Sequence, residues 1–189
     1  MKKVIIVTGH HASLKTTVSR QLGSDLGIMV YHLEEMKEII KGLEVLESEG
    51  RHSYYRRLAL KLIENLIIDT LNVQDSVMLE MFYVDAYYHQ IIELCKKMNF
   101  ETVTLFLTGD PEALYARYSK RAPYGVMNKK ALRVLDLLEF KDTMEAINPI
   151  DRHGNTIEVD TTNFDDHDYR ILMHQLIDKL EWKLNDLKL

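Results

Sequence analysis

The chain has 189 residues, a length that suits one domain with a full hydrophobic core. Apolar residues make up 46% and charged residues 28%, the composition of a soluble globular protein. The net charge of −5 argues against bulk electrostatic attraction to nucleic acid or to an anionic membrane, so we expect neither as a partner.

Cysteine content and the opening residues bear on the compartment. One cysteine, Cys95, excludes an internal disulfide and suits a reducing compartment; its apolar-periodic surroundings predict a buried structural thiol. No apolar run approaches the ~20 residues that a membrane span requires. A strand-like run follows Lys2 and Lys3 directly and leaves no room for a signal peptide. We therefore expect a cytoplasmic protein.

Short apolar runs alternate with helix-like segments along the whole chain. Their near-continuous apolar character indicates strands that are covered on both faces, as in a parallel sheet. The predicted strands are residues 3–8, 28–32, 76–82, 102–107 and 156–160. The predicted helices are residues 15–26, 33–41, 54–71, 86–98, 110–121, 129–146 and 166–187. This alternation predicts an α/β fold, a three-layer α/β/α sandwich around a five-stranded parallel sheet, with its binding site at the carboxyl ends of the strands.

The first predicted strand runs into most of the phosphate-binding loop G-x-x-x-x-G-K-[ST]. Backbone N–H groups of such a loop wrap an anion, the lysine reaches the outer phosphates and the hydroxyl holds Mg²⁺. The helix that follows points its positive end at the same place. The sequence therefore predicts a nucleotide site made of nine consecutive residues: Gly9, His10, His11, Ala12, Ser13, Leu14, Lys15, Thr16 and Thr17.

Leu14 stands where this motif has its second glycine. A glycine before the lysine takes a positive φ and leaves room for the phosphate. A leucine held at positive φ costs about 1–2 kcal/mol, and its side chain must point away from the ligand. The alternative is an ordinary strand–turn–helix with a chance Lys-Thr pair. The coincidence of strand, leading glycine, Lys15, Thr16 and helix favours the phosphate site.

Carboxylates follow two of the predicted strands. Glu34 and Glu35 come after the second strand, where one could serve as the base for an acceptor hydroxyl or as an outer-sphere partner of Mg²⁺. The alternative is that both simply favour the start of a helix. Glu80 lies at the tip of the third strand and Asp85 five residues on, where they could polarise a magnesium-bound water or grip the acceptor. Solvated carboxylates at a strand end are the alternative.

Arginines gather at two places. Arg117 and Arg121 lie one helical turn apart before a loop-like segment, a position suited to holding transferring phosphate charge and excluding water. Two surface arginines are the alternative. A second group beside Tyr54 and Tyr55 could bind an anionic or ring-bearing acceptor, or could be a solvated helix start; it consists of Arg51, Arg56 and Arg57.

With these motifs the chain resembles the P-loop kinase-like ATPases, in particular their zeta-toxin-like, shikimate-kinase-like and polynucleotide-kinase-like small domains. The resemblance covers the full length, although only Gly9–Thr17 is highly specific, as a degenerate Walker A loop. It implies a single P-loop nucleoside triphosphate hydrolase domain over residues 1–189, with an acceptor-binding helical region at about 33–72 and a lid at about 117–130. Residues 160–162 end the last predicted strand, and in such folds the loop at this position commonly contacts the purine of the nucleotide.

The resemblance also implies ATP and Mg²⁺ as cofactors and assigns roles. Lys15 would contact the β- and γ-phosphates, Thr16 would hold Mg²⁺, and Arg117 and Arg121 would be lid arginines. Relatives often carry aspartates after the second and third strands, for which Glu34 or Glu35 and Glu80 or Asp85 must stand in. We expect an ATP-dependent phosphotransferase with a small-molecule acceptor. The alternatives are a nucleotide-binding regulatory protein without turnover and a nucleoside triphosphate hydrolase without a separate acceptor.

Overall fold

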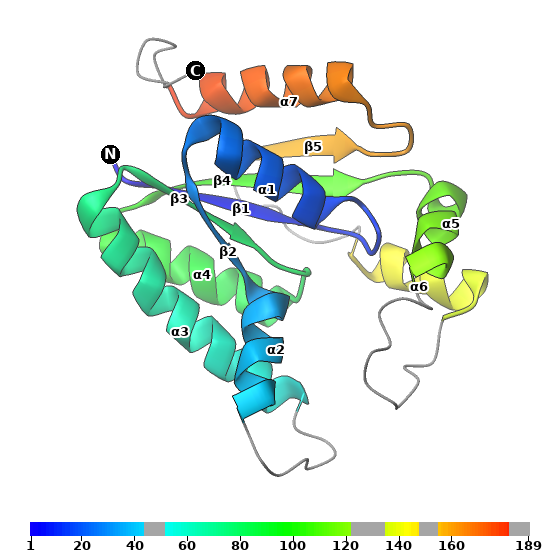
Figure 1. The fold of residues 1–189 in the computed structure, drawn as a ribbon, viewed down its shortest axis with the longest axis horizontal. Coiled ribbons are helices and arrows are strands. Elements are labelled where there is room, and N and C mark those ends of the chain that lie inside the picture. Colours follow the sequence, from blue (N-terminus) through cyan, green and yellow to red (C-terminus); the bar gives the residue numbers. More distant parts are fainter. Residues whose placement is uncertain (44–51, 122–134, 148–154, 182–189) are drawn as a thin grey trace.

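The computed structural model describes residues 1–43, 52–121, 135–147 and 155–181, and in this part of the chain five parallel strands form one sheet in the order β2-β3-β1-β4-β5 (Figure 1). The strands are β1 (Lys3–Gly9), β2 (Met29–His32), β3 (Ser76–Glu80), β4 (Glu101–Thr108) and β5 (Thr156–Asp160). Central β1 pairs with β3 and β4, so Val7 lies between Glu80 and Leu105. The predicted five-stranded parallel sheet is confirmed.

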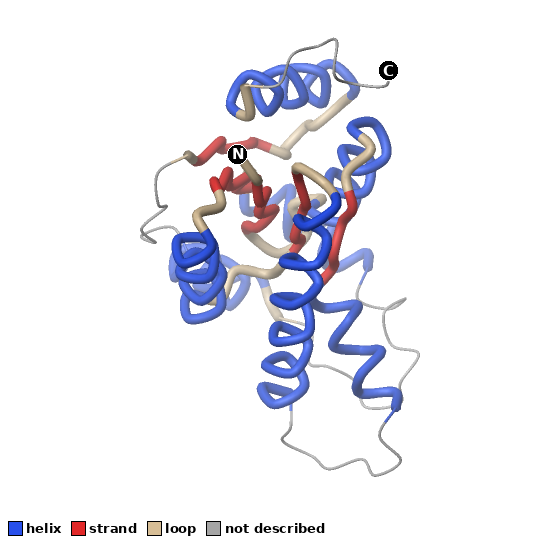
Figure 2. The backbone as a smooth tube through the Cα atoms, turned by 90° about the vertical axis from the view of Figure 1, so that its left-hand side faces the viewer, coloured by secondary structure: helices blue, strands red, loops and turns tan. Residues whose placement is uncertain are grey.

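Helices cover both faces of the sheet (Figures 1 and 2). They are α1 (Lys15–Leu26), α2 (Leu33–Leu43), α3 (His52–Val73), α4 (Asp85–Met98), α5 (Pro111–Arg121), α6 (Leu137–Ile147) and α7 (Asp166–Lys179). Successive side chains of β1 point to opposite faces. Val4 and Ile6 pack in one core with α3 and α4, whereas Ile5 and Val7 pack in the other with α1 and α7. The three-layer α/β/α architecture is therefore confirmed.

A third, smaller core joins α5 to α6 beside the turn that follows β1 (Figure 1). Leu114 of α5 and Phe140 and Met144 of α6 form its buried part. This pair of helices lies outside the two main layers, at the end of the sheet where the parallel strands terminate. It brings α5 and α6 to the same edge as the predicted phosphate loop.

Several predicted boundaries differ from the structure within the described residues, three of them with a visible local cause or consequence. β3 ends at Glu80 instead of residue 82, although the Met81 N–H still donates to the Val7 carbonyl at 3.0 Å. The sixth helix begins at Leu137, because Asp136 and Glu139 form a reciprocal cap in which each side chain accepts from the other's backbone N–H, at 2.9 and 3.0 Å. The last helix ends at Lys179, with Glu181 at a φ of 51°. The remaining predicted helical residues, 129–134 and 182–187, lie outside the described residues.

Two expectations from composition can be compared with the structure. Cys95 is buried in the core, and burial raises the pKa of its thiol to about 12, so the predicted inert, structural thiol is confirmed. Among the described helices, none combines the length and the apolar character that crossing a bilayer demands.

Candidate active site

The turn after β1 has a backbone that begins with an obligatory glycine. Gly9 has a φ of 133°, and a Cβ built on it would lie 2.0 Å from the Leu107 carbonyl oxygen. Any larger residue here would collide with the backbone of β4. The next N–H, of His10, donates to the same Leu107 oxygen at 3.0 Å, so the turn is fastened to β4 as it leaves the sheet.

Leu14 takes the conformation that the motif reserves for glycine. Its φ and ψ are 62° and 15°, and Ala12 is also left-handed with a φ of 56°. The Leu14 side chain packs against the core formed with α1 and α7. The leucine therefore holds the left-handed conformation at a cost of about 1–2 kcal/mol, which its packing offsets.

Hydrogen bonds inside the turn hold it closed. The His10 carbonyl oxygen accepts from the Ser13 hydroxyl at 2.8 Å and from the Lys15 ammonium at 2.5 Å. The buried His10 ring bonds through Nδ1 to the Thr108 hydroxyl at 3.0 Å. His10 and Ser13 thus shape the loop and anchor it to β4, which explains polar residues at two fully buried positions.

The first turn of α1 carries no side chain that would compete with a bound anion. Its N-cap residue, Leu14, supplies no side-chain hydrogen bond to the helix, and its first turn contains no acidic residue. The first N–H groups of a helix have no intrahelical partner, and the helix dipole makes this end positive. Thr16 and Thr17 lie in that first turn. The geometry suits an anion such as a phosphate.

Lys15 is partly buried and lies within a group of charges. Burial lowers the pKa of Lys15 to about 8; Glu80 opposes this effect, Arg121 adds to it and Glu34 opposes it again. The structure therefore brings four sequence-predicted residues into electrostatic contact from α1, α2, β3 and α5. The ammonium also lies 5.6 Å from the centre of the Phe82 ring.

His11 belongs to an aromatic cluster. Its ring stacks on Phe82 with centroids 4.2 Å apart and planes inclined by 25°, and the rings of Tyr118 and Phe140 lie 6.1 and 6.3 Å away. Burial, assisted by the charge on Lys15, lowers the pKa of His11 to about 4. His11 is therefore a neutral aromatic side chain at neutral pH, which links the loop to α5 and α6.

Glu80 is the carboxylate that reaches Lys15, whereas Asp85 does not lie near it. Glu80 Oε2 pairs with His32 Nδ1 at 3.1 Å, and the two side chains are only 8% and 10% exposed. Asp85 instead makes local contacts at the start of α4, where it lies 3.1 Å from His89 Nε2 and accepts a hydrogen bond from the Tyr83 hydroxyl at 3.3 Å.

The donor set suits Mg²⁺ held jointly with a nucleotide. The described residues contain no group of three His, Cys, Asp or Glu side chains placed to hold a metal on their own. Thr16 offers a hydroxyl at the start of α1 and Glu80 a carboxylate one strand away, and hard oxygen donors of this kind fit Mg²⁺ when phosphate oxygens complete the shell.

The two glutamates after β2 have separate environments. Glu34 accepts from Arg56 Nε at 2.8 Å and from the buried Lys37 ammonium at 2.5 Å. Burial acts to raise the pKa of Glu34, but these hydrogen bonds outweigh it and hold the pKa below its ordinary value. Glu35 is exposed and pairs with Arg20 of α1. The sequence thus names both residues, but only Glu34 is coupled to the loop; Arg51 lies outside the described residues.

The two arginines of α5 also have different surroundings. Arg117 donates through Nη2 to the Thr162 carbonyl at 2.6 Å and to the Thr161 carbonyl, so it ties α5 to the segment after β5. Arg121, at the end of α5, is exposed and lies close enough to act on the pKa of Lys15. Residues 122–134, which include most of the predicted lid, lie outside the described residues.

Three contacts escape the sequence patterns. Phe82 and the Phe140–Tyr118 pair approach His11 of the loop from separate segments, His32 pairs with Glu80, and no local periodicity marks these contacts. The one available signal was the position of Phe82, an aromatic residue immediately past the end of a buried strand.

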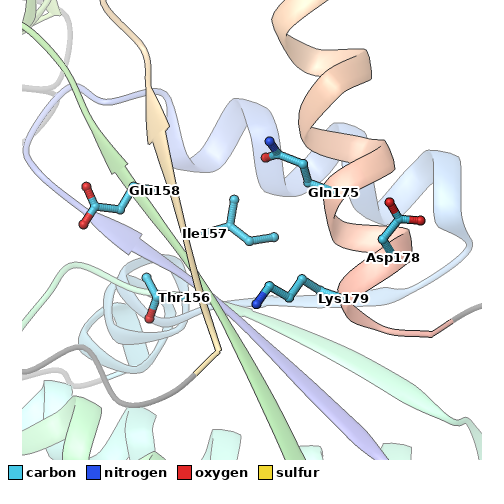
Figure 3. A pocket seen from close by; sticks show the side chains of 6 residues that line it. All are labelled: Thr156, Ile157, Glu158, Gln175, Asp178 and Lys179. Carbon is cyan, nitrogen blue, oxygen red and sulfur yellow. The ribbon is translucent and has the colours of Figure 1, made fainter.

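An open depression of about 540 Å³ lies away from this site, between β5 and α7 (Figure 3). Its lining comprises Thr156, Ile157, Glu158, Gln175, Asp178 and Lys179. Thr156 begins β5, so the depression extends from the end of the sheet opposite to the phosphate loop. Polar, exposed side chains at an edge strand give it no evident chemistry.

Several solved structures with the same arrangement are described as kinases. A protein of Chloroflexus aurantiacus that is provisionally identified as a kinase aligns over 95% of this chain and 96% of its own, with a TM-score of 0.74 and 21% identity. The fold is that of the P-loop kinases. A shikimate kinase of Bacteroides thetaiotaomicron matches over 94% of this chain and 98% of its own (TM-score 0.59, 17% identity), and a gluconokinase of Sinorhizobium meliloti over 95% and 96% (TM-score 0.59, 15% identity).

The likeness is one of structure alone. No family model and no curated protein matches the sequence. At identities this low the alignments show the P-loop kinase-like fold, and the chemistry has to be argued from the residues of the site.

Proposed function

We propose that the chain is an ATP-dependent phosphotransferase that moves the γ-phosphate of ATP to a small-molecule acceptor. One observation carries the proposal: the partly buried Lys15 follows a left-handed turn and begins a helix whose first turn has neither a side-chain cap nor an acidic residue. A desolvated cation facing unpaired N–H groups suits a polyphosphate. The P-loop kinase-like fold supports the same chemistry.

The side chains around the loop then have separate roles in binding ATP, the phosphate donor. Lys15 binds the outer phosphates, exchanging its bond to the His10 carbonyl for phosphate oxygens. Arg121 approaches from α5 and adds a second positive charge that stabilises the transferring group. Thr16 and Glu80 would hold Mg²⁺, which neutralises phosphate charge when it is bound. Catalysis of this kind rests on positioning and charge.

The acceptor side is proposed at α2 and the start of α3. Glu34 acts on the pKa of Lys15, so this part of α2 faces the transferring phosphate. Its bonds to Arg56 and Lys37 keep the carboxylate ionised and oriented, so it can accept a hydrogen bond from an acceptor hydroxyl. The predicted pair Glu34 and Glu35 is reduced to Glu34 here, because Glu35 pairs with Arg20 away from Lys15.

Substitution of Lys15 tests the proposal. We expect Lys15→Ala to remove ATP binding, measured by titration calorimetry with and without Mg²⁺, because residues 9–17 then contain no lysine or arginine. Lys120→Ala is the matched control, since Lys120 is an exposed lysine on α5. Circular dichroism should show the same fold in all three proteins. Equal ATP affinity in wild type and Lys15→Ala would remove Lys15 from the site.

A nucleotide-binding protein without turnover is the second candidate. Two contacts favour it: Lys15 is bonded to its own loop, and Glu80 is paired with His32 instead of lying unpartnered. ADP release measured across a panel of nucleosides, nucleotides, sugars and hydroxy acids separates the two functions. Acceptor-dependent ADP release supports the phosphotransferase, acceptor-independent release supports a hydrolase, and binding without release supports the regulatory protein.

A further inference from the structure

Among the described residues, Phe82 is the one aromatic side chain that contacts both Lys15 and His11 of the loop. It lies two residues beyond Glu80 and is half-buried. Its ring centre is 5.6 Å from the Lys15 ammonium nitrogen. The same ring stacks on His11 at 4.2 Å with an inclination of 25°. Neither contact belongs to the phosphate-loop motif.

The Phe82 ring stabilises the Lys15 cation without placing a negative charge beside it. A buried ammonium needs stabilisation, yet a carboxylate in direct contact would neutralise it and compete with phosphate. Within the described residues no carboxylate lies within ion-pair distance of Lys15, and its hydrogen-bond acceptor is the His10 carbonyl. The negative face of an aromatic ring attracts a cation without carrying a charge, most strongly when the cation is desolvated.

The Phe82 ring is held by His11 of the loop, which itself lies beside rings of α5 and α6. His11 stacks on it, and the rings of Tyr118 and Phe140 lie 6.1 and 6.3 Å from His11. Phe140 is fully buried in the core shared by α5 and α6. Since His11 is uncharged at neutral pH, this contact brings no positive charge close to Lys15.

We infer that Phe82 is a positioning residue that holds the charged Lys15 ammonium in the phosphate loop through its aromatic face, with His11 fixing the ring. The inference rests on the proposed function in that Lys15 serves a bound polyphosphate, but the contact itself exists without nucleotide. It extends the site to a side chain outside the loop and predicts that an aromatic residue is required at this position.

The first test uses the nucleotide-free protein. The order parameter of the labelled Lys15 Cε methylene is measured by NMR relaxation, with the signal assigned by its loss in Lys15→Arg. In Phe82→Leu, which keeps an apolar side chain without a π face, we expect this order parameter to fall, because the ammonium is no longer held by the ring. Phe82→Tyr should keep the wild-type value, because the aromatic face is retained. An unchanged order parameter in Phe82→Leu overturns the inference.

The second test measures ATP affinity by calorimetry in the same variants. We expect Phe82→Leu to bind ATP about three- to thirtyfold more weakly and Phe82→Tyr to restore wild-type affinity. Wild-type affinity or tighter binding in Phe82→Leu overturns the positioning role. Absence of ATP binding in the wild type contradicts the proposed function, while the order parameter of Lys15 in the nucleotide-free protein still decides the role of Phe82. Should Phe82→Leu fail to fold, Phe82→Met carries both measurements.

Discussion

At the scale of single residues, the loss of water around Lys15 favours the binding of an anionic ligand. The ammonium gives up water on folding, and its pKa falls to about 8 mainly for that reason. Nearby Glu80 and Glu34 limit the fall without forming an ion pair with it. A phosphate that enters the loop supplies the missing negative charge, so part of the cost of desolvation is recovered when the ligand binds.

This arrangement makes a prediction about pH. The pKa of Lys15 in the ligand-free fold is about 8, and a bound polyphosphate raises it, so the complex holds the Lys15 proton more tightly than the free protein does. ATP affinity should therefore fall as the pH rises through about 8, and binding near that pH should take up a proton. Calorimetry in buffers of different ionisation enthalpy measures the uptake. Affinity that stays constant from pH 7 to 9.5, with no uptake, contradicts the prediction.

His11 makes no contribution to this profile above pH 5. Its pKa, lowered to about 4 chiefly by burial, leaves it neutral throughout the range in which Lys15 titrates. Two adjacent histidines in a phosphate loop suggest metal binding or proton transfer at first sight. In the structure the two histidines have other roles, because His10 anchors the loop to Thr108 and His11 stacks on Phe82.

At the scale of elements, the start of α1 decides how a degenerate loop keeps its shape. Leu14 occupies the N-cap with a φ of 62°, and its side chain joins the core between the sheet and α1. Strain in the backbone and burial of the side chain act in opposite directions and are of similar size, about 1–2 kcal/mol each. The loop therefore tolerates leucine because the residue lies over a core that can accept it.

Leu14→Gly tests this balance. Glycine relieves the left-handed strain but loses the leucine's packing, so we expect the free energy of unfolding to change by less than about 1 kcal/mol. ATP affinity should be retained or improved, because glycine leaves the concave face of the loop open. Urea unfolding and calorimetry provide the two measurements. A collapse of affinity in a folded variant would mean that this loop binds phosphate with a different geometry.

At the scale of the whole molecule, α5 joins two distant parts of the sheet edge. Arg117 fastens it to the carbonyls of Thr161 and Thr162 after β5, while Arg121 lies toward Lys15 after β1. Phe140 and Leu114 join α6 to the same helix. The sequence predicts equivalent roles for the two arginines because they are one turn apart. The fold separates them, since the helix passes between two loops.

The two arginines should therefore differ when they are replaced. Arg117→Met should lower the free energy of unfolding by about 1–3 kcal/mol, because it removes charge-assisted hydrogen bonds to two carbonyls. Arg121→Met should leave stability within about 0.5 kcal/mol and lower turnover more than ATP affinity, as expected of an exposed residue that acts on the transferring phosphate. Denaturant unfolding and steady-state kinetics measure both. Equal stability losses would contradict the separation.

Local patterns in the sequence were sufficient for the elements and the loop. Apolar runs of β1, β3 and β4 predict a parallel sheet because central strands are covered on both faces, and Gly9, Lys15 and Thr16 mark the turn because each has a separate steric or charge role there. The cap formed by Asp136 and Glu139 is also a short local pattern, but the longer periodic segment that contains it predicts an earlier helix start.

Tertiary structure alone decided which charges and rings meet at Lys15. Glu80 rather than Asp85 reaches the ammonium, Glu34 rather than Glu35 faces the loop, and Phe82 lies beneath it, because these side chains come from strands and helices far apart in the sequence. Their approach depends on strand order and on where each strand ends. Sequence spacing fixes neighbours only within a helix or a strand, and contacts across the sheet edge arise when the layers pack.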